Sequence, residues 1–163
     1  MRYAIYFTPR QDEPLARIAA NWLGRDPFGA ATRPVEAVGE LSAAEVAFHT
    51  ASARRYGFHA TLTEAEIERR SPDSLKPAEF RNLCQWGYPY VFETFRFHMT
   101  LSGRAGTQES PRLRAAIDGL FAQVLQQPVP VDALTLFVET EPGAPFMVLS
   151  HHALGRRAAR KTA

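Results

Sequence analysis

Alternating hydrophobic and polar residues predict strands at both ends of this chain. Residues 2–8 alternate and are rich in strand-forming side chains, and residues 131–139 and 146–152 show a similar pattern. The last two segments are separated by Pro142-Gly143, a pair that is typical of tight turns. We therefore expect the second and third of these strands to form a β-hairpin.

Helical periodicity predicts a helix directly after the first strand. Apolar residues recur at helical spacing from Leu15 to Trp22, with Asp12 ahead of them as the expected N-cap and Gly24 as a stop signal. Residues 25–40 hold two prolines and two glycines, so an irregular loop is expected there.

Capping signals predict further helices, and two more strands lie among them. A capping box at Ser42 opens a helix that ends near Arg54, and one at Thr63 precedes short helices over residues 63–86. A long helix with a one-sided apolar stripe starts at Ser110. The added strands are expected over residues 55–62 and 94–103, with a turn at residues 87–89. This mixed order predicts an α+β fold, with helices packed on an antiparallel sheet.

Composition places the chain among ordinary soluble globular proteins. It has 163 residues, of which 45% are hydrophobic and 22% charged, and a formal net charge of +2. We expect one domain of two lobes over residues 1–155 and a basic tail at residues 156–163. Because no aromatic residues are interleaved with the basic tail, nucleic acid is not a favoured partner.

The length of the hydrophobic runs and the cysteine content indicate the cellular location of the protein. No apolar run approaches the roughly 20 residues that cross a bilayer, and the first apolar stretch is too short for a secretory signal. A single cysteine, Cys84, excludes an internal disulfide framework. We therefore expect a cytoplasmic protein without a membrane partner, and a buried structural thiol at Cys84.

One pentapeptide pattern occurs twice in the chain. Residues 58–62 read Phe-His-Ala-Thr-Leu, and residues 97–101 read Phe-His-Met-Thr-Leu. Side chains alternate between the faces of a strand, so the histidine and threonine of each copy should share one face. The phenylalanine and leucine should anchor the opposite face in a core.

The two copies carry residues suited to phosphoryl chemistry. Strands brought side by side would place His59, Thr61, His98 and Thr100 around one cavity. Histidine titrates near neutrality and can both accept and donate a proton. Cleavage of a phosphodiester needs a base, an acid and donors for the phosphoryl oxygens, and threonine hydroxyls can be such donors without a metal.

A structural role and a metal-binding role are the alternatives to a catalytic role for the histidines. A single His beside a Phe is often a half-buried structural residue, but a matched pair favours a site. A zinc site would need a third ligand, and only one of His151 and His152 could contribute, because neighbours in a strand face opposite ways. His49 lies on a predicted helix and is expected at the solvated surface. We therefore expect no metal and no cofactor.

These motifs resemble those of the 2H phosphoesterase superfamily. Residues 54–62, 87–92 and 95–103, with the opening 2–7 and the closing 142–146, are similar to a branch associated with phosphonate metabolism. The resemblance implies a bilobal α+β fold with one His-x-Thr motif in each lobe, and metal-free action on a cyclic phosphodiester in the cleft between them. It implies the catalytic residues His59, Thr61, His98 and Thr100, and as secondary substrate-binding candidates Arg55, Tyr56, Arg96 and Tyr6. Strand alternation ranks Tyr56 below Arg55, because it would point Tyr56 toward the core.

The chain departs from this family after Leu62. Members of the family continue with a Lys-Pro-Pro-Phe-like stretch, a helix and strands before a Thr-Glu-Ala-Glu-like segment, whereas here residues 63–66 follow Leu62 directly. A first lobe that lacks several dozen residues would expose strand edges and apolar surface. A natural deletion covered by homo-oligomerisation or strand exchange, a shortened piece and an inactive remnant are all open.

Three functions are compatible with this pattern. The leading hypothesis is hydrolysis of a cyclic phosphodiester, a phosphorylated sugar or nucleotide, in phosphonate catabolism. The second is a catalytically impaired protein that still binds phosphate or a nucleotide. The third is processing of RNA 2′,3′-ends, which needs a basic groove and predicts salt-sensitive RNA binding. The pattern does not assign which histidine is the base.

Overall fold

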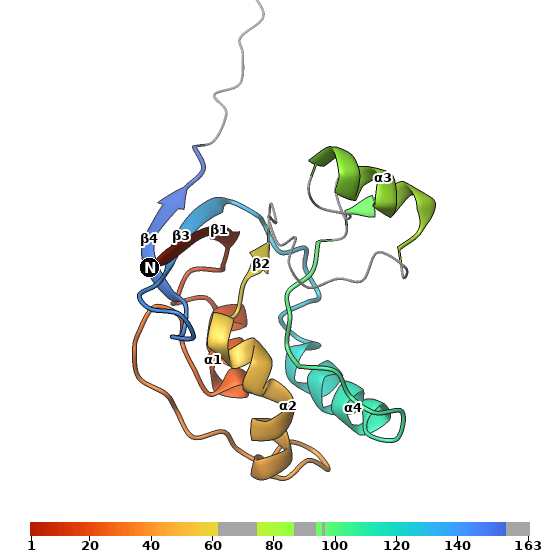
Figure 1. The fold of residues 1–163 in the computed structure, drawn as a ribbon. Helices are drawn as coiled ribbons and strands as arrows, with labels where there is room; N and C mark the ends of the chain where they lie inside the picture. Colours follow the sequence, from red (N-terminus) through yellow and green to blue (C-terminus); the bar gives the residue numbers. More distant parts are fainter. Residues whose placement is uncertain (62–74, 87–93, 96, 156–163) are drawn as a thin grey trace, which may run out of the picture.

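An antiparallel sheet forms one side of the molecule. The fold comes from a computed structural model that describes residues 1–61, 75–86, 94–95 and 97–155. Within these residues, four strands form one sheet in the order β2-β1-β3-β4 (Figure 1). The strands are β1 (Arg2–Phe7), β2 (Ala60–Thr61), β3 (Ala133–Glu139) and β4 (Met147–Ala153). The predicted α+β fold with an antiparallel sheet is confirmed, as is the β3–β4 hairpin.

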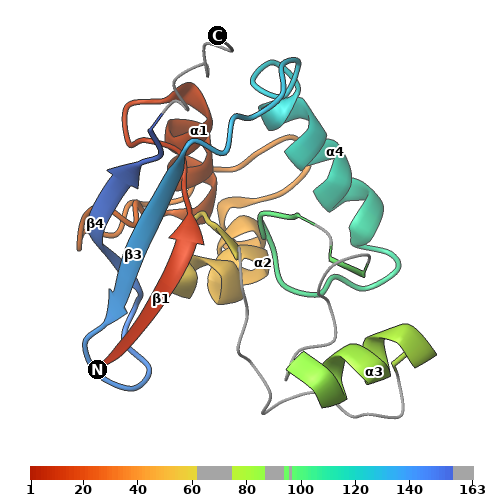
Figure 2. The same ribbon diagram turned by 90° about the horizontal axis from the view of Figure 1, so that it is seen from above.

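Helices flank one side of this sheet. Seen from above, α1 and α2 lie behind the strands, with α4 beside them, whereas α3 lies apart from the other helices (Figure 2). The helices are α1 (Pro14–Leu23), α2 (Ala43–Tyr56), α3 (Pro77–Trp86) and α4 (Ser110–Phe121). No helix in the part of the chain that the structure describes is long and apolar enough to span a bilayer.

The ends of α1 and α2 follow from their capping residues. Gly24 ends α1 in the left-handed conformation, at φ 67°, which glycine adopts without a side-chain clash. The N-cap of α1 is Glu13, not the predicted Asp12, and no side-chain cap forms there because Pro14 already supplies a preorganised first turn. At the start of α2, Ser42 and Glu45 make the predicted capping box. Hydrogen bonds from Ser42 are the main cause that lowers the pKa of Glu45 to about 2.

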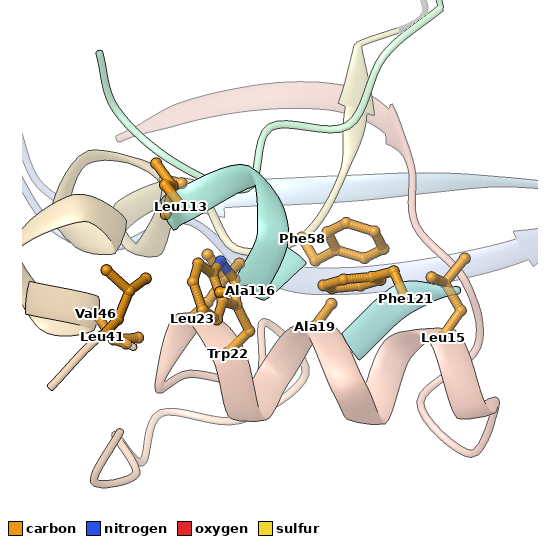
Figure 3. Packing of buried hydrophobic residues seen from close by; sticks show 11 residues of the cluster. Leu15, Ala19, Trp22, Leu23, Leu41, Val46, Phe58, Leu113, Ala116 and Phe121 are labelled. Atoms are coloured by element: carbon orange, nitrogen blue, oxygen red, sulfur yellow. The ribbon is translucent and has the colours of Figure 1, made fainter. Parts of the chain in front are cut away.

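The hydrophobic core lies between α1, α2, α4 and the first pentapeptide. Phe58 packs on Phe121 of α4, with ring centroids 6.4 Å apart, beside Ala19 and Leu15 of α1 (Figure 3). Met99 and Leu101 of the second pentapeptide pack against the same cluster. The core thus holds both copies of the repeated motif against the helices.

One face of the sheet carries exposed apolar side chains. Strand alternation and register put Tyr3, Ile5 and Leu134 on one face, and their exposed fractions are 56%, 53% and 37%. Thr135 and Phe137, on the other face, are fully buried. The two-lobed organisation of residues 1–155 stays a prediction.

In two segments that are predicted to be strands, most of the described residues are not in a strand. In the segment 55–62, α2 continues through Tyr56, two residues beyond its predicted end, and among residues 55–61, which the structure describes, only Ala60–Thr61 is paired. In the segment 94–103, the described residues make a single bridge, between Met99 and Ala60. Helix-favouring residues before Gly57 account for the first difference. Within the described part of the chain, the second segment pairs with β2 alone, at the single bridge of Met99.

Two further predictions about single side chains are wrong. Cys84 is exposed on α3, where a buried thiol was expected. His49 is buried on α2, at 5% exposure, because the segment after the second pentapeptide lies against it. The predicted capping box at Thr63, the turn at 87–89 and the basic tail lie outside the described residues.

Candidate active site

The first pentapeptide is anchored on both sides. Phe58 and Ala60 are buried, and the Thr8 hydroxyl donates a hydrogen bond of 2.7 Å to the Phe58 carbonyl. On the other face, Thr61 pairs with Tyr6 across β2 and β1. The alternation predicted for residues 58–61 therefore holds, and it turns His59 and Thr61 away from the core.

His59 is held by its backbone neighbours and by aromatic rings. Its Nδ1 lies 2.9 Å from the Gly57 carbonyl oxygen. A carbonyl can only accept, so this contact requires a proton on Nδ1. The imidazole also packs against Tyr6, with centroids 4.1 Å apart, and lies 6.0 Å from the ring of Tyr56. These contacts fix the position of a half-buried imidazole.

The second pentapeptide reaches the site through backbone contacts. The Trp22 indole donates to the Leu101 carbonyl at 2.8 Å, and the Gly103 amide donates to the His49 carbonyl at 2.7 Å. With Met99 and Leu101 packed on the core, His98 and Thr100 lie on the opposite side and are exposed. The predicted alternation holds for residues 98–101 without a regular strand, but the predicted core anchor Phe97 is 44% exposed.

Both pentapeptides border one pocket. Its volume is about 220 Å³. His59 and Thr61 line it from the first copy, and His98 and Thr100 line it from the second. The rest of the described lining comes from β1 and from the end of α2, and consists of Tyr6, Ser52, Ala53, Tyr56 and Gly57. The structure thus brings together the four residues predicted as catalytic.

The secondary candidates divide between the pocket and its surroundings. Tyr6 and Tyr56 line the pocket, whereas Arg55 does not. The predicted ranking of Arg55 above Tyr56 assumed strand alternation, and it is wrong because both residues lie in the last turn of α2. Tyr56 stacks on Phe146 with a centroid distance of 5.3 Å. Arg96 lies outside the described residues.

Arg55 is engaged in an ion pair next to the pocket. It binds Glu139, which also accepts from Arg2 at 2.9 Å and from the Gly143 amide at 3.0 Å. The hydrogen bond from Arg55 lowers the pKa of Glu139, and the same bond raises the pKa of Arg55. Arg55 therefore stays charged and ties α2 to β3.

Ser52 and Gly57 are pocket residues that the sequence reasoning missed. Ser52 precedes Tyr56 by four residues, so helical periodicity would have placed both on one face of α2 had the helix been predicted to reach Tyr56. The fixed positive φ of Gly57 has no sequence signal beyond the glycine itself. In the described part of the chain, no group of three His, Cys, Asp or Glu residues gathers as a metal site.

Comparisons with known proteins define the family. Residues 27–147 match the family described as "Protein of unknown function (DUF1045)", and the chain belongs to this family. It is also similar to the ribose 1,5-bisphosphate phosphokinase PhnN of Janthinobacterium sp. (strain Marseille), with 29% identity over 224 residues, covering 90% of this chain and 49% of that protein. The protein of the same name from Laribacter hongkongensis (strain HLHK9) is 31% identical over 210 residues, covering 90% and 50%. No solved structure matches the chain at a comparable level of significance.

The alignments show how the length of this chain compares with that of its relatives. The chain spans about half the length of these two curated relatives. The matched stretch extends over 224 residues in the first relative although the chain has only 163, so several dozen aligned positions have no counterpart here. This agrees with the expected lack of a segment of comparable size.

Proposed function

We propose that this chain is a metal-independent phosphoesterase that hydrolyses a cyclic phosphodiester. The observation that carries the proposal is the pocket that His59, Thr61, His98 and Thr100 line together. Two segments about 40 residues apart in sequence thereby contribute the same pair of functional groups to one cavity. A coincidental duplication would not require this convergence.

These four side chains are sufficient for an in-line hydrolysis. One imidazole accepts a proton from water as the water oxygen bonds to phosphorus, and the other imidazole protonates the ester oxygen as its bond to phosphorus breaks. The ring of the cyclic diester opens to a phosphomonoester, and the two histidines have exchanged protonation states. The hydroxyls of Thr61 and Thr100 donate hydrogen bonds to the phosphoryl oxygens, where negative charge concentrates.

The substrate we propose is a phosphorylated sugar. The pocket, at about 220 Å³, is smaller than the roughly 300 Å³ from which cavities for drug-sized ligands start. A small cyclic sugar phosphate therefore fits better than a nucleotide. The names of the relatives, which specify a ribose bisphosphate, and the resemblance to a branch associated with phosphonate metabolism favour the same substrate class.

The kinase activity in the relatives' names has no matching P-loop motif in this chain. A nucleotide-binding P-loop needs the pattern Gly-x-x-x-x-Gly-Lys-Ser/Thr. Gly24 and Gly29 have the glycine spacing, but Ala30 stands where the lysine is required. A phosphoryl-transfer role in phosphonate metabolism is the broader proposal, and the two-histidine hydrolase is its specific form.

Hydrolysis of a panel of cyclic phosphodiesters in the presence of EDTA tests this proposal. We expect turnover of cyclic sugar phosphates by the wild type, and a loss of about 100-fold or more in His59→Ala and in His98→Ala, the size of a general acid or base contribution. His152→Ala is the matched control, since His152 is exposed on β4 and does not line the pocket. Activity that survives both pocket substitutions, or that is absent in the wild type, contradicts the proposal.

A non-catalytic phosphate binder is the second candidate. The observation in its favour is the exposure of His98 and Thr100, which lie outside the regular sheet and so are less preorganised than the first pair. This candidate predicts that a sugar phosphate raises the melting temperature, following RT ln(1 + [L]/Kd), with no product formed. Salt-sensitive binding of RNA oligonucleotides in the same assay would instead favour RNA end processing.

A further inference from the structure

The chain passes from α2 to His59 through a sharp corner at Gly57. The Gly57 amide donates to the Ala53 carbonyl at 3.1 Å and so closes the helix, while its φ of +74° turns the chain into the first pentapeptide. A Cβ on residue 57 would lie only 2.7 Å from Pro27 Cβ. Two independent constraints, the positive φ and the close approach of Pro27, therefore require glycine here.

The orientation of the Gly57 carbonyl determines the proton position on His59. This carbonyl accepts from Nδ1 at 2.9 Å, so the neutral ring carries its proton on Nδ1 and its lone pair on Nε2. Tyr6 packs on the ring at 4.1 Å and opposes its rotation. Nε2 is thus the nitrogen through which the neutral ring accepts a proton.

A buried arginine, Arg25, binds backbone carbonyls next to the Gly57 corner. Arg25 is only 2% exposed, and its Nη1 donates to the carbonyls of Arg54 at 2.8 Å and Arg55 at 3.0 Å, the last turn of α2. Its Nη2 donates to the carbonyl of Phe146, whose ring stacks on Tyr56. A cation at the C-terminus of a helix also interacts favourably with the helix dipole.

The segment 25–27 is also fixed by a hydrogen bond to β4. The Pro27 carbonyl accepts from the Val148 amide at 2.9 Å, and the Phe146 amide donates to the Arg55 carbonyl at 2.9 Å. Residues 25–27 are therefore clamped between the end of α2 and the start of β4. The two side chains that border the Gly57 corner, Arg25 and Pro27, belong to this clamped segment.

We propose that Gly57 and Arg25 are positioning residues, which fix His59 as its Nδ1–H tautomer and present Nε2 to the pocket. This inference rests on the proposed function, because the tautomer matters only if His59 transfers protons. Neither residue touches the reacting atoms. They act through the imidazole of His59. Substituting a positioning residue should therefore change the tautomer of His59 and kcat, whereas substituting a purely structural residue should not.

The first test is the tautomer of His59 in the wild-type protein. Nitrogen-15 chemical shifts of the imidazole, recorded at a pH where the ring is neutral and assigned by comparison with His59→Ala, distinguish the two tautomers. We expect the Nδ1–H form, and a ring with its proton on Nε2 overturns the proposal. If this tautomer is present but no substrate is hydrolysed, the proposed function fails while the positioning of the ring stands.

Substitutions at the corner are the second test. In Gly57→Ala we expect a mixture of tautomers and a fall in kcat of about 100-fold, the cost of misplacing a reacting group by about 1 Å, with a much smaller change in KM. Gly39→Ala is the matched control: Gly39 also has a positive φ, +57°, but no atom lies within 4 Å of the added Cβ. It should lose stability without a change in tautomer or kcat. Equal effects of the two substitutions on tautomer and kcat contradict the proposal.

A conservative change at Arg25 covers the case in which Gly57→Ala does not fold. Arg25→Lys keeps a cation, but an ammonium group cannot reach all three carbonyls with the geometry of a guanidinium fork. We expect a kcat about 10-fold below the wild type and a partial loss of the Nδ1–H tautomer. A folded Arg25→Lys protein with the wild-type tautomer and kcat removes Arg25 from the proposal.

Discussion

The two pentapeptides share a sequence pattern but differ in how the fold holds them. The first lies at the glycine corner and in β2, with Phe58 at 4% exposure. The second lies outside the regular sheet, makes one bridge to the first, and leaves Phe97 44% exposed. The same chemical pair is thus presented once from a buried scaffold and once from a segment that a few backbone contacts and the partly buried Met99 and Leu101 hold in place. Local sequence sets which side chains face the pocket, and tertiary packing sets how firmly they are held.

The largest expected difference between the copies is in the role of their phenylalanines. Phe58→Ala should lower the free energy of unfolding by about 3–5 kcal/mol, because it empties a fully packed core position against Phe121. Phe97→Ala should cost only about 1 kcal/mol, because nearly half of the side chain is already in contact with water. Urea denaturation of both variants measures the two values. Similar losses would mean that the second copy is packed as tightly as the first.

Gly103 probes how the second copy is held on α2. A Cβ added there would lie 2.9 Å from the Ser52 hydroxyl, at the point where the Gly103 amide binds the His49 carbonyl. We expect Gly103→Ala to lower the free energy of unfolding by about 1–2 kcal/mol through overpacking. The double variant Gly103→Ala with Ser52→Ala is the control, since it removes the atom that clashes and should recover part of the loss. No loss in the single variant would show that this contact does not hold the second copy.

The smallest expected effect concerns acid sensitivity near the first copy. Arg55 lowers the pKa of Glu139 in the folded state, so the carboxylate stabilises the fold at neutral pH. This contribution is fully present above the unfolded pKa of about 4.3 and is lost as the pH falls through the lowered folded value. It should be small, because both arginine partners are partly exposed to solvent.

A comparison of urea midpoints at pH 7 and at about pH 3 tests this effect. The difference between wild type and Glu139→Gln should shrink as the pH falls below the unfolded pKa, because proton binding then favours the unfolded state. Glu141→Gln, at an exposed neighbouring position, should show no such convergence. Parallel behaviour of the wild type and Glu139→Gln would mean that this carboxylate does not couple folding to pH.

The sequence predicted the elements whose signals are local. The capping box at Ser42, the glycine stop at Gly24 and the turn at Gly143 each depend on residues within one turn of chain, and all three define boundaries in the structure. The alternation within each pentapeptide was predicted for the same reason. None of these predictions needs to know how the elements are arranged relative to one another in space.

Features that depend on tertiary contacts were not predictable in this way. The strand expected over residues 94–103 makes only one bridge among the described residues, and α2 extends through Tyr56 into a segment whose pattern predicts a strand. His49 is buried because a segment more than 50 residues later lies against it. The engagement of Arg55 by Glu139 likewise joins residues 84 positions apart. The convergence of the four pocket residues was predicted from chemistry, as were the nearby Tyr6 and Tyr56, whereas the roles of Ser52, Gly57 and Arg25 came only from the structure.

The place of β1 in the sheet has a consequence for synthesis of the protein. β1 leaves the ribosome long before its longest partner, β3, which begins only at Ala133. At about 5–20 residues per second, the edge of β1 that pairs with β3 must wait several seconds for its partner. Such distant pairing slows folding and leaves nascent chains open to aggregation. We expect the yield of folded protein to depend on chaperones that bind the N-terminal strand during this interval.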